Sequence, residues 1–334
     1  MFLNRKQIEM TQTNRNAWLA IVALSMTVVA GCASNSGVEG SFDRQFTVNG
    51  PVSLELTSGK GDAHITSGPP GEVRIHGDIS VKAWSSESGR RRVQQIEANP
   101  PLSQEGSLIR IGGGKQGGGD VDVDYTIVVP QDTQLSSVAG SGDLEVHGIE
   151  GPANFTSGSG DVHASEINRD VQIVCGAGDV VLSKVKGQVQ INTGSGDISL
   201  DTIGGQIRLQ TGSGSIDITN PSQALEASTG NGDVTIKEAS ADIRVRTASG
   251  DLDIEGNPGE SNYWDFHTVS GEVVLHVPPN ASFRLYARSK SGDIDAAIPI
   301  MMEGTAAKHE LRARIGDGKA RVEIQTSSGD ISLH

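Results

Sequence analysis

The sequence predicts an all-β protein folded as a parallel β-solenoid, similar to a single-stranded β-helix, and three observations support this fold class. The dipeptide Gly-Asp returns at a constant spacing, beginning at Gly142, Gly160 and Gly178 and continuing to Gly250, and a fixed period of this kind is typical of stacked repeats. Within each period apolar and polar residues alternate, as they do in a strand that buries one face. The 334 residues include 43 glycines and only 4% aromatic residues, so turns are abundant and bulky core residues are few.

The alternation gives four apolar columns when the sequence is aligned on the 18-residue period. A single two-stranded unit cannot bury its apolar face, whereas like strands stacked about 4.8 Å apart turn each column into an internal ladder. We therefore expect flattened coils of 18 to 21 residues, each with two main strands. The columns are Leu144, Val162, Val180, Ile198, Ile216, Val234 and Leu252; Val146, Ala164, Leu182, Leu200, Ile218, Ile236 and Ile254; Ala153, Val171, Val189, Ile207, Leu225 and Ile243; and Phe155, Ile173, Ile191, Leu209, Ala227 and Val245.

Two other arrangements fit parts of this pattern. A triangular hexapeptide helix has coils of the same length, but it needs an apolar residue at every sixth position, and the inward positions here are spaced unevenly. In the first coil after Gly142 they are Leu144, Val146, Ile149, Ala153 and Phe155. An antiparallel meander of hairpins is the competing interpretation.

The two corners of the predicted coil differ in composition. Glycine pairs occupy the first corner, where positive φ costs little. The second corner carries a partial inward column of Ile149, Ile167, Val185 and Ile203.

The chain divides into four segments on this basis. Residues 1–31 are a signal peptide, 32–41 a linker, 42–135 N-terminal strands and a cap, and 136–334 the solenoid, whose turns become more widely spaced after Gly250, at Gly271, Gly292 and Gly329. Within the cap, Val93 and Ile96 lie on one helical face among polar residues, which predicts one short helix near 86–98 that ends at Asn99. A cap is expected because an open solenoid end would expose unpaired backbone and apolar ladders.

The N-terminus has the order of features found in exported lipoproteins. Basic residues precede an apolar run from Ala17 to Ala30 that is too short for a convincing membrane span, and the run ends in Val29-Ala30-Gly31-Cys32. This junction resembles the lipobox of bacterial lipoproteins, and the resemblance implies that Cys32 is acylated and that Ala33 directs the protein to the outer membrane. A secretory signal without lipidation is the alternative. With Cys32 acylated, Cys175 has no disulfide partner and is expected in the core.

The repeat Thr-Gly-Ser-Gly-Asp-Ile, the lead-in Phe42-Asp43-Arg44-Gln45-Phe46-Thr47-Val48 and the terminal Ser328-Gly329-Asp330-Ile331 resemble a bacterial family labelled "putative adhesin". Its members carry a domain of unknown function with Gly-Asp β-strand repeats and are often secreted or lipid-anchored. The resemblance covers about residues 42–334. It implies architecture rather than activity, because the family supplies no catalytic residues to transfer to this chain.

The repeated aspartates are the most prominent candidate site. Stacked carboxylates repel one another unless they point into water or share a cation. We expect each carboxylate to bond backbone amides of its own turn, with a hydroxyl replacing it at Ser215, so no metal site is assigned; calcium binding is the alternative. The aspartates are Asp143, Asp161, Asp179, Asp197, Asp233 and Asp251.

The histidines and the aromatic residues give weaker signals. The histidines follow no common register in the repeat. Tyr263, Trp264 and Phe266 are expected to fill a wider core, and a binding patch is the alternative.

The composition and the even array point to a surface rather than a reaction centre. A formal net charge of −14 argues against nucleic acid and anionic lipid as partners. We expect no catalytic residues and no cofactor, and interpret the chain as a non-enzymatic, lipid-anchored module of the cell envelope, attached to the membrane through its N-terminal lipid and contacting an envelope protein or a glycan. A polysaccharide-binding or polysaccharide-processing enzyme on the same scaffold is the alternative, and it would need insertions that build a cleft on one face.

Overall fold

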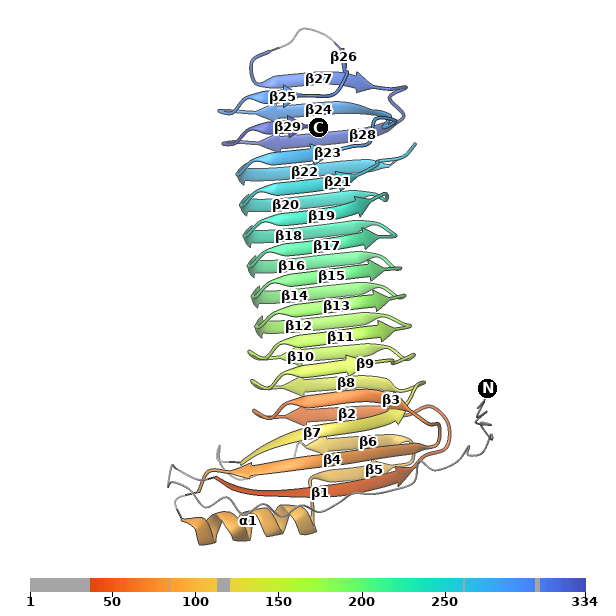
Figure 1. Ribbon diagram of the computed structural model, residues 1–334, viewed down its shortest axis with the longest axis vertical. Coiled ribbons are helices and arrows are strands. Elements are labelled where there is room, and N and C mark those ends of the chain that lie inside the picture. The colour runs from red at the N-terminus through yellow and green to blue at the C-terminus, as the bar shows by residue number, and fades with distance from the viewer. Residues whose placement is uncertain (1–36, 84, 113–120, 261, 304–306) are drawn as a thin grey trace, which may run out of the picture. The chain divides into compact units, whose positions relative to one another are not determined.

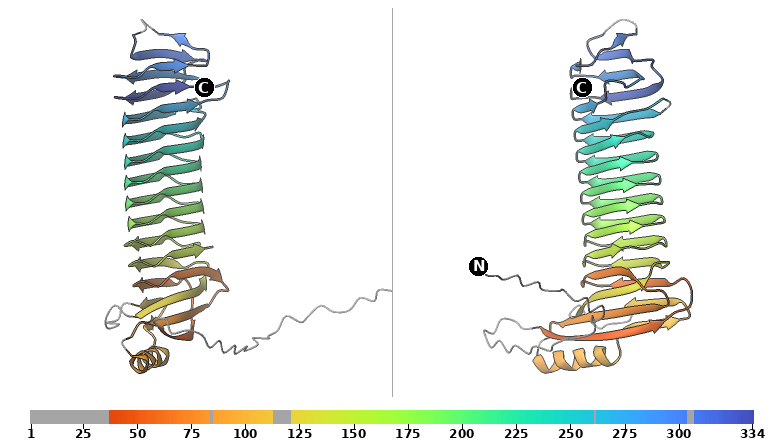
Figure 2. Two further views of the ribbon diagram at one scale, coloured as in Figure 1. Left: turned by 60° about the vertical axis from the view of Figure 1, so that its left-hand side comes forward. Right: turned by 45° about the vertical axis from the view of Figure 1, so that its right-hand side comes forward.

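From β6 to β26 successive strands alternate between two long sheets, so that each coil in this part of the chain gives one strand to each sheet (Figure 1). The computed structural model describes residues 37–334 except 84, 113–120, 261 and 304–306. These residues contain 29 strands and one helix, in sheets of 14 and 15 strands. Two further views show the same stack of strands from other sides (Figure 2).

The central array consists of eight coils, each with one strand in either sheet. The strands of the 14-stranded sheet are β9 (Leu144–His147), β11 (Val162–Ile167), β13 (Val180–Val185), β15 (Ile198–Ile203), β17 (Ile216–Pro221), β19 (Val234–Ala239), β21 (Leu252–Gly256) and β23 (Val273–His276). Those of the 15-stranded sheet are β8 (Gln134–Ala139), β10 (Ala153–Ser157), β12 (Val171–Ala177), β14 (Val189–Ser195), β16 (Ile207–Ser213), β18 (Leu225–Asn231), β20 (Ile243–Ser249) and β22 (Tyr263–Ser270).

The pairing within the array is parallel and in register, so the predicted solenoid is confirmed and the hairpin meander is excluded. Val180 lies opposite Ile198, and Ile191 lies opposite Leu209, so that each residue pairs with its equivalent one period further along the chain. All members of the four predicted columns are buried. Strands that follow one another along the chain lie in different sheets, and the core is the layer of apolar side chains between these sheets.

The first corner needs glycine because consecutive coils approach each other through their backbones. Gly196 has a φ of 139°, and a Cβ atom at this position would collide with the carbonyl oxygen of Gly178 in the preceding coil. The same contact recurs one coil later between Gly214 and Gly196. Any side chain at these positions would push two coils apart, which explains why the repeat glycine is retained even where the aspartate is not.

The second corner is left-handed although its residues are not glycines. Each of five coils places one residue there at a φ of 54–58°, a conformation that costs an ordinary L-residue about 1–2 kcal/mol. The residue that follows, such as Val185 after Lys184, turns back into the core. The next N–H then bonds the preceding coil, as Lys186 does to the carbonyl of Ile167 at 2.9 Å. The left-handed residues are Glu166, Lys184, Thr202, Asn220 and Glu238.

The N-terminal end is closed by antiparallel strands and by helix α1 (Ser86–Ala98), at the position predicted for a helix. Val93 and Ile96 are buried, and the Ser85 side chain caps the helix by accepting the Ser88 N–H at 3.2 Å. In the stack, β2 and β3 lie between β8–β9 and β6–β7, so parallel coils extend into the segment assigned to the cap. The strands are β1 (Val38–Thr47), β2 (Ser53–Ser58), β3 (Ala63–Gly68), β4 (Glu72–Val81), β5 (Leu102–Glu105), β6 (Leu108–Gly112) and β7 (Val121–Pro130).

At the C-terminal end the last coil of the chain is inserted between two earlier coils. Strand β28 lies between β22 and β24, and β29 lies between β23 and β25. Strands β27 and β26 pair antiparallel beyond β24 and close the stack. This insertion explains the long interval before Gly329. The strands are β24 (Phe283–Ser289), β25 (Ile294–Ala296), β26 (Met301–Met302), β27 (Glu310–Ile315), β28 (Ala320–Thr326) and β29 (Ile331–Leu333).

The aromatic group near the end of the array divides between the core and the surface. Trp264 and Phe266 are fully buried opposite Ile243 and Val245, and the Trp264 indole donates to the carbonyl of Ala241 at 2.7 Å. They fill the core as predicted. Tyr263 points the other way, onto the outward face of the sheet, where its hydroxyl contacts Glu323 at 3.0 Å.

Because successive residues of a strand point alternately into the core and into solvent, the same substitution at two neighbouring positions should change the free energy of unfolding very differently. Ile198→Asp places a carboxylate between Val180 and Ile216 in the core, so we expect the free energy of unfolding to fall by about 3–5 kcal/mol. Ser199→Asp, its exposed neighbour, should cost less than about 1 kcal/mol. Urea unfolding of both variants measures this difference, and equal losses would contradict the register.

The inserted coil predicts a local rather than a global effect of truncation. A chain ending at Gly318 lacks β28 and β29 and thus loses the buried residues Val322, Ile324, Ile331 and Leu333. We expect the amides of β24 and β27 to lose protection against hydrogen exchange, whereas those of β12 to β16 remain protected, because each coil contacts only its neighbours. Full protection of β24 would mean that this strand pairs with β22 directly.

Candidate binding surface

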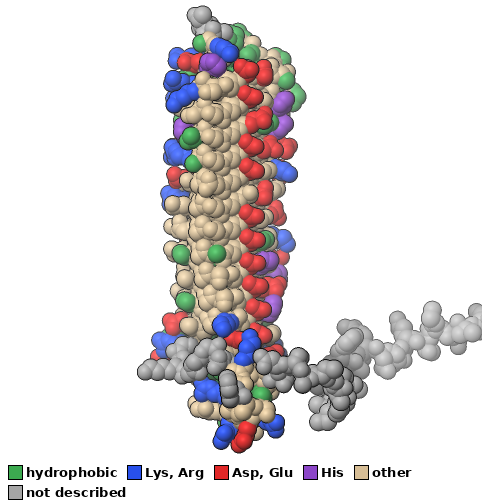
Figure 3. Space-filling model, turned by 90° about the vertical axis from the view of Figure 1, so that its left-hand side faces the viewer, with side chains coloured by type: hydrophobic (Ala, Val, Ile, Leu, Met, Phe, Trp, Pro, Cys, Tyr) green, Lys and Arg blue, Asp and Glu red, His purple; other side chains and the backbone are tan. Residues whose placement is uncertain are grey.

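The aspartates of the first corner form a line of hydrogen bonds between coils, with breaks after Ser215 and after Glu272. The Oδ1 atom of Asp161 accepts the N–H of Asp179 at 2.8 Å, and Asp179 in turn accepts the N–H of Asp197 at 2.8 Å. Figure 3 views the molecule from the side of these corners and shows acidic side chains in a line along the stack. The same bond joins Asp124 to Asp62, Asp62 to Asp143, Asp143 to Asp161, Asp197 to Ser215, Asp233 to Asp251, Asp251 to Glu272 and Asp330 to Asp293.

This geometry corrects the expected role of the aspartates. They were expected to bond amides of their own turn, but each carboxylate accepts the N–H of the equivalent residue in the next coil. The predicted substitution by a hydroxyl is also wrong. Ser215 donates its N–H to Asp197 at 2.8 Å, yet among the described residues no bond joins its hydroxyl to the N–H of Asp233. The reason is reach, because a serine hydroxyl is one bond shorter than a carboxylate and the next coil lies about 4.8 Å away.

A second, buried line of hydroxyls ties the same corner to the core. Ser157 donates to the carbonyl of Gly160 at 2.9 Å, and Thr229 donates to that of Gly214 at 3.2 Å. Cys175 takes the equivalent place, is 3% exposed and has its sulfur 3.8 Å from two glycine carbonyls. Burial raises the pKa of this thiol, so it is less reactive than an ordinary cysteine. The column stabilises the glycine corner and offers no site.

The histidines lie mostly on the outward faces beside carboxylates. His64 contacts Glu145 at 2.8 Å, and His76 contacts Asp43 at 2.8 Å. The hydrogen bond to Asp43 is the main reason that the pKa of His76 is raised, so this tie between β4 and β1 is strongest below the ordinary histidine pKa and weakens as the pH rises through the raised value. The rings of His276 and His334 stack at 5.3 Å, a pairing created by the inserted last coil and therefore hidden in the sequence.

Within the described residues the carboxylates, histidines and Cys175 form no group that could hold a metal ion. The part of the chain that the structure describes also contains no helix long and apolar enough to cross a membrane. The predicted lipidation residue Cys32 and the apolar run before it lie outside the described residues.

Comparison with known families agrees with this architecture. Two overlapping stretches, residues 113–239 and 209–334, match the family model described as Toastrack DUF4097. The chain belongs to the Toastrack DUF4097 family. The resemblance to a family of unknown function with Gly-Asp repeats is thereby confirmed over residues 113–334.

The solved structures that resemble this Toastrack protein share little sequence identity with it. One is described as a putative lipid binding protein from Parabacteroides distasonis, with 12% identity, 90% of this chain and 98% of that chain covered, and a TM-score of 0.43. Another, described as a putative adhesin from Bacteroides fragilis, has 13% identity, 88% and 97% coverage and a TM-score of 0.38. None of the curated proteins matches the chain.

The coil-to-coil role of the aspartates predicts a graded response to substitution. Asp197→Asn keeps an oxygen acceptor for the Ser215 N–H and should change the melting midpoint little, whereas Asp197→Ala removes the acceptor and should cost about 1 kcal/mol. Conversely, Ser215→Asn supplies the missing acceptor for Asp233 and should stabilise the fold. Thermal melts with and without chelator measure these effects. A rise of several degrees on adding calcium, lost in Asp197→Asn, would show instead that a cation joins the coils.

Proposed function

We propose that this Toastrack protein is a non-enzymatic, lipid-anchored module of the bacterial cell envelope that presents a long β-solenoid face to other envelope components. The observation that carries the proposal is the use of the repeated side chains. The aspartates bond the next coil and the buried hydroxyls bond the glycine corner, so the repeat builds a rigid surface.

The same observation weighs against the polysaccharide-processing alternative. A glycosidase needs two carboxyl groups that face one scissile bond across a cleft. The aspartates of the array stand in a row along one corner, each in contact with backbone of the next coil. The array between Gly142 and Gly250 also lacks the insertions that would raise walls around such a bond.

The anchor is proposed from the sequence at Ala30-Gly31-Cys32, and the net charge of −14 supports it indirectly. A negatively charged protein is repelled by the anionic surface of a membrane, so attachment through side chains is unfavourable. A covalent lipid on Cys32 avoids this repulsion because its acyl chains insert directly into the hydrocarbon layer.

Anchoring through Cys32 predicts a change in cell fractionation. Cys32→Ser removes the thiol that is acylated, so we expect the protein to move from the membrane fraction to the soluble fraction, or to keep an uncleaved N-terminus. Cys175→Ser is the matched control, since Cys175 is buried in the solenoid, and this variant should stay in the membrane fraction. Labelling with a palmitate analogue checks the lipid itself; membrane retention of Cys32→Ser without label in the wild type would contradict the anchor.

A further inference from the structure

Arginines gather on one part of the outward face of the 15-stranded sheet. The outward positions of its last five long strands hold seven arginines and three carboxylates, in a protein whose formal net charge is −14. These outward positions thus carry a net positive charge, opposite in sign to that of the molecule as a whole. The arginines are Arg244, Arg246, Arg284, Arg288, Arg312, Arg314 and Arg321, and the carboxylates are Asp265, Glu310 and Glu323.

Strand register places three of these arginines side by side. Arg314 of β27 lies opposite Arg284 of β24, which lies opposite Arg321 of β28. Neighbouring strands are about 4.8 Å apart, and like charges directly opposite each other are unfavourable. The outer two have carboxylate neighbours, Glu303 at 3.8 Å from Arg314 and Glu323 at 3.2 Å from Arg321. Among the described residues no carboxylate forms an ion pair with the central Arg284 guanidinium, which leaves this charge available to an external anion.

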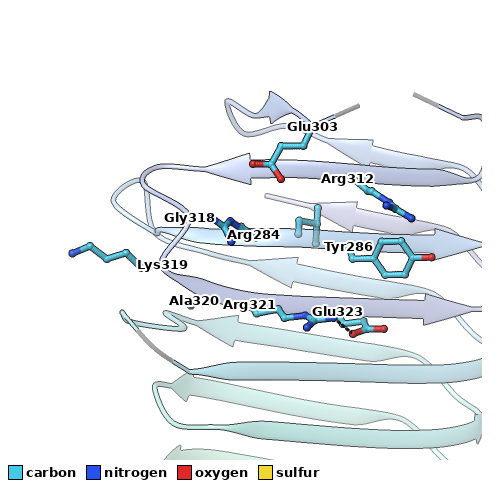
Figure 4. A pocket seen from close by; sticks show the side chains of 10 residues that line it. Arg284, Tyr286, Glu303, Arg312, Gly318, Lys319, Ala320, Arg321 and Glu323 are labelled. Carbon is cyan, nitrogen blue, oxygen red and sulfur yellow. Dashed lines mark hydrogen bonds and ion pairs between the residues drawn. The ribbon is translucent and has the colours of Figure 1, made fainter. Parts of the chain in front are cut away.

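Two of these arginines, Arg284 and Arg321, border an open hollow of about 500 Å³ on the sheet surface. Its lining also includes Tyr286 from β24, Arg312 from β27 and Lys319 just before β28, together with the carboxylates of Glu303 and Glu323, as Figure 4 shows. This volume is sufficient for one or two sugar rings and lies within the range of small-molecule sites.

Tyrosine rings hold two of the guanidinium groups in place. The Arg312 guanidinium lies 5.2 Å from the centre of the Tyr286 ring, and that of Arg321 lies 5.6 Å from the Tyr263 ring. Contacts of this kind favour a fixed orientation of the cation. A fixed, planar guanidinium presents paired donors that match the two oxygens of a carboxylate, which a lysine ammonium cannot do.

A more distant part of the same sheet face is suited to hydroxyl groups. The outward positions of β12, β14 and β16 carry amides, namely Gln172, Gln190, Asn192 and Gln210, which both donate and accept hydrogen bonds. These side chains project from the same sheet as the arginines, several coils away from them. A ligand with many hydroxyls and a few acidic groups would match both parts of the face.

We propose that the arginine cluster is the recognition site for a glycan that carries carboxylate groups, with Arg284 as its central contact. This inference rests on the proposed function and names the partner class of the envelope module. The long-range field decides against a dense polyanion. Nucleic acid or an anionic bilayer would bring many charges against a protein of net charge −14, whereas a carboxylate on a sparsely charged sugar chain meets mainly the arginines within a screening length of about 10 Å.

Calorimetry on the full-length protein in neutral detergent tests the proposal, with a hyaluronan tetrasaccharide, which carries a carboxylate on alternate sugars, as the acidic probe and maltotetraose as the neutral one. We expect the acidic probe to bind and the neutral probe to bind at least about tenfold more weakly. Arg284→Gln should weaken binding of the acidic probe about tenfold, because a charge-assisted hydrogen bond is lost. The matched control is Arg110→Gln on β6, an exposed arginine near the other end of the same sheet, which should leave the affinity within about twofold.

Three outcomes would overturn the proposal: equal affinity for the two sugars or none for either, equal loss in the two variants, and tighter binding to single-stranded DNA or to vesicles containing anionic lipid. Both arginines are exposed, so the melting midpoint of each variant should match the wild type and exclude unfolding as the cause of a loss. The result is independent of Cys32→Ser fractionation. If the protein is anchored but binds no sugar, this inference is wrong and the proposed function stands. If it binds the acidic sugar but is not anchored, the proposed lipid anchor is wrong and this inference stands.

Discussion

The structure depends on the stacking of coils in register, because the backbone N–H groups of each strand must donate to C=O groups of the strand one coil away. This constraint fixes the path of the chain more strictly than apolar burial does. At the first corner the coils come so close that Gly196 has no room for a Cβ atom beside Gly178. At the second corner the path requires a left-handed residue, and the fold accepts the conformational cost at Thr202 and its equivalents because the buried residue that follows completes the core.

Stacking in register also means that each side chain has its own equivalent as a neighbour, which is unfavourable for charged residues. The aspartate line resolves this conflict because each carboxylate accepts an N–H from the next coil and the oxygens project from an exposed corner. Hydrogen bonds donated by backbone amides to these carboxylates offset part of the repulsion along the line. The acidic character of the molecule therefore has a source in the construction of the fold.

The sequence allowed the array to be predicted because its information is local and periodic. The inward columns, the glycine corner and the helix at 86–98 all follow from spacing and residue type. The inward residue of the second corner was predicted, but its left-handed residue could not be, since Glu166, Lys184, Thr202 and Asn220 share no chemistry and owe their conformation to the stack. The direction of the aspartate bond was also out of reach, because a turn residue has amides nearby in its own coil and in the next, and only the coil spacing decides between them.

The order of the terminal coils was hidden for a different reason, and it bears directly on function. Because the repeats have similar sequences, the sequence does not specify which repeat each one pairs with. The insertion of β28 between β22 and β24 is therefore visible only in three dimensions. That insertion brings Arg321 beside Arg284, from which it is separated along the chain by β25, β26 and β27, and it brings Tyr263 beside Arg321. A strictly periodic solenoid can repeat one surface but cannot gather unlike side chains at one place. In this Toastrack protein the proposed recognition site therefore lies where the period fails, at the end of the stack that closes the core.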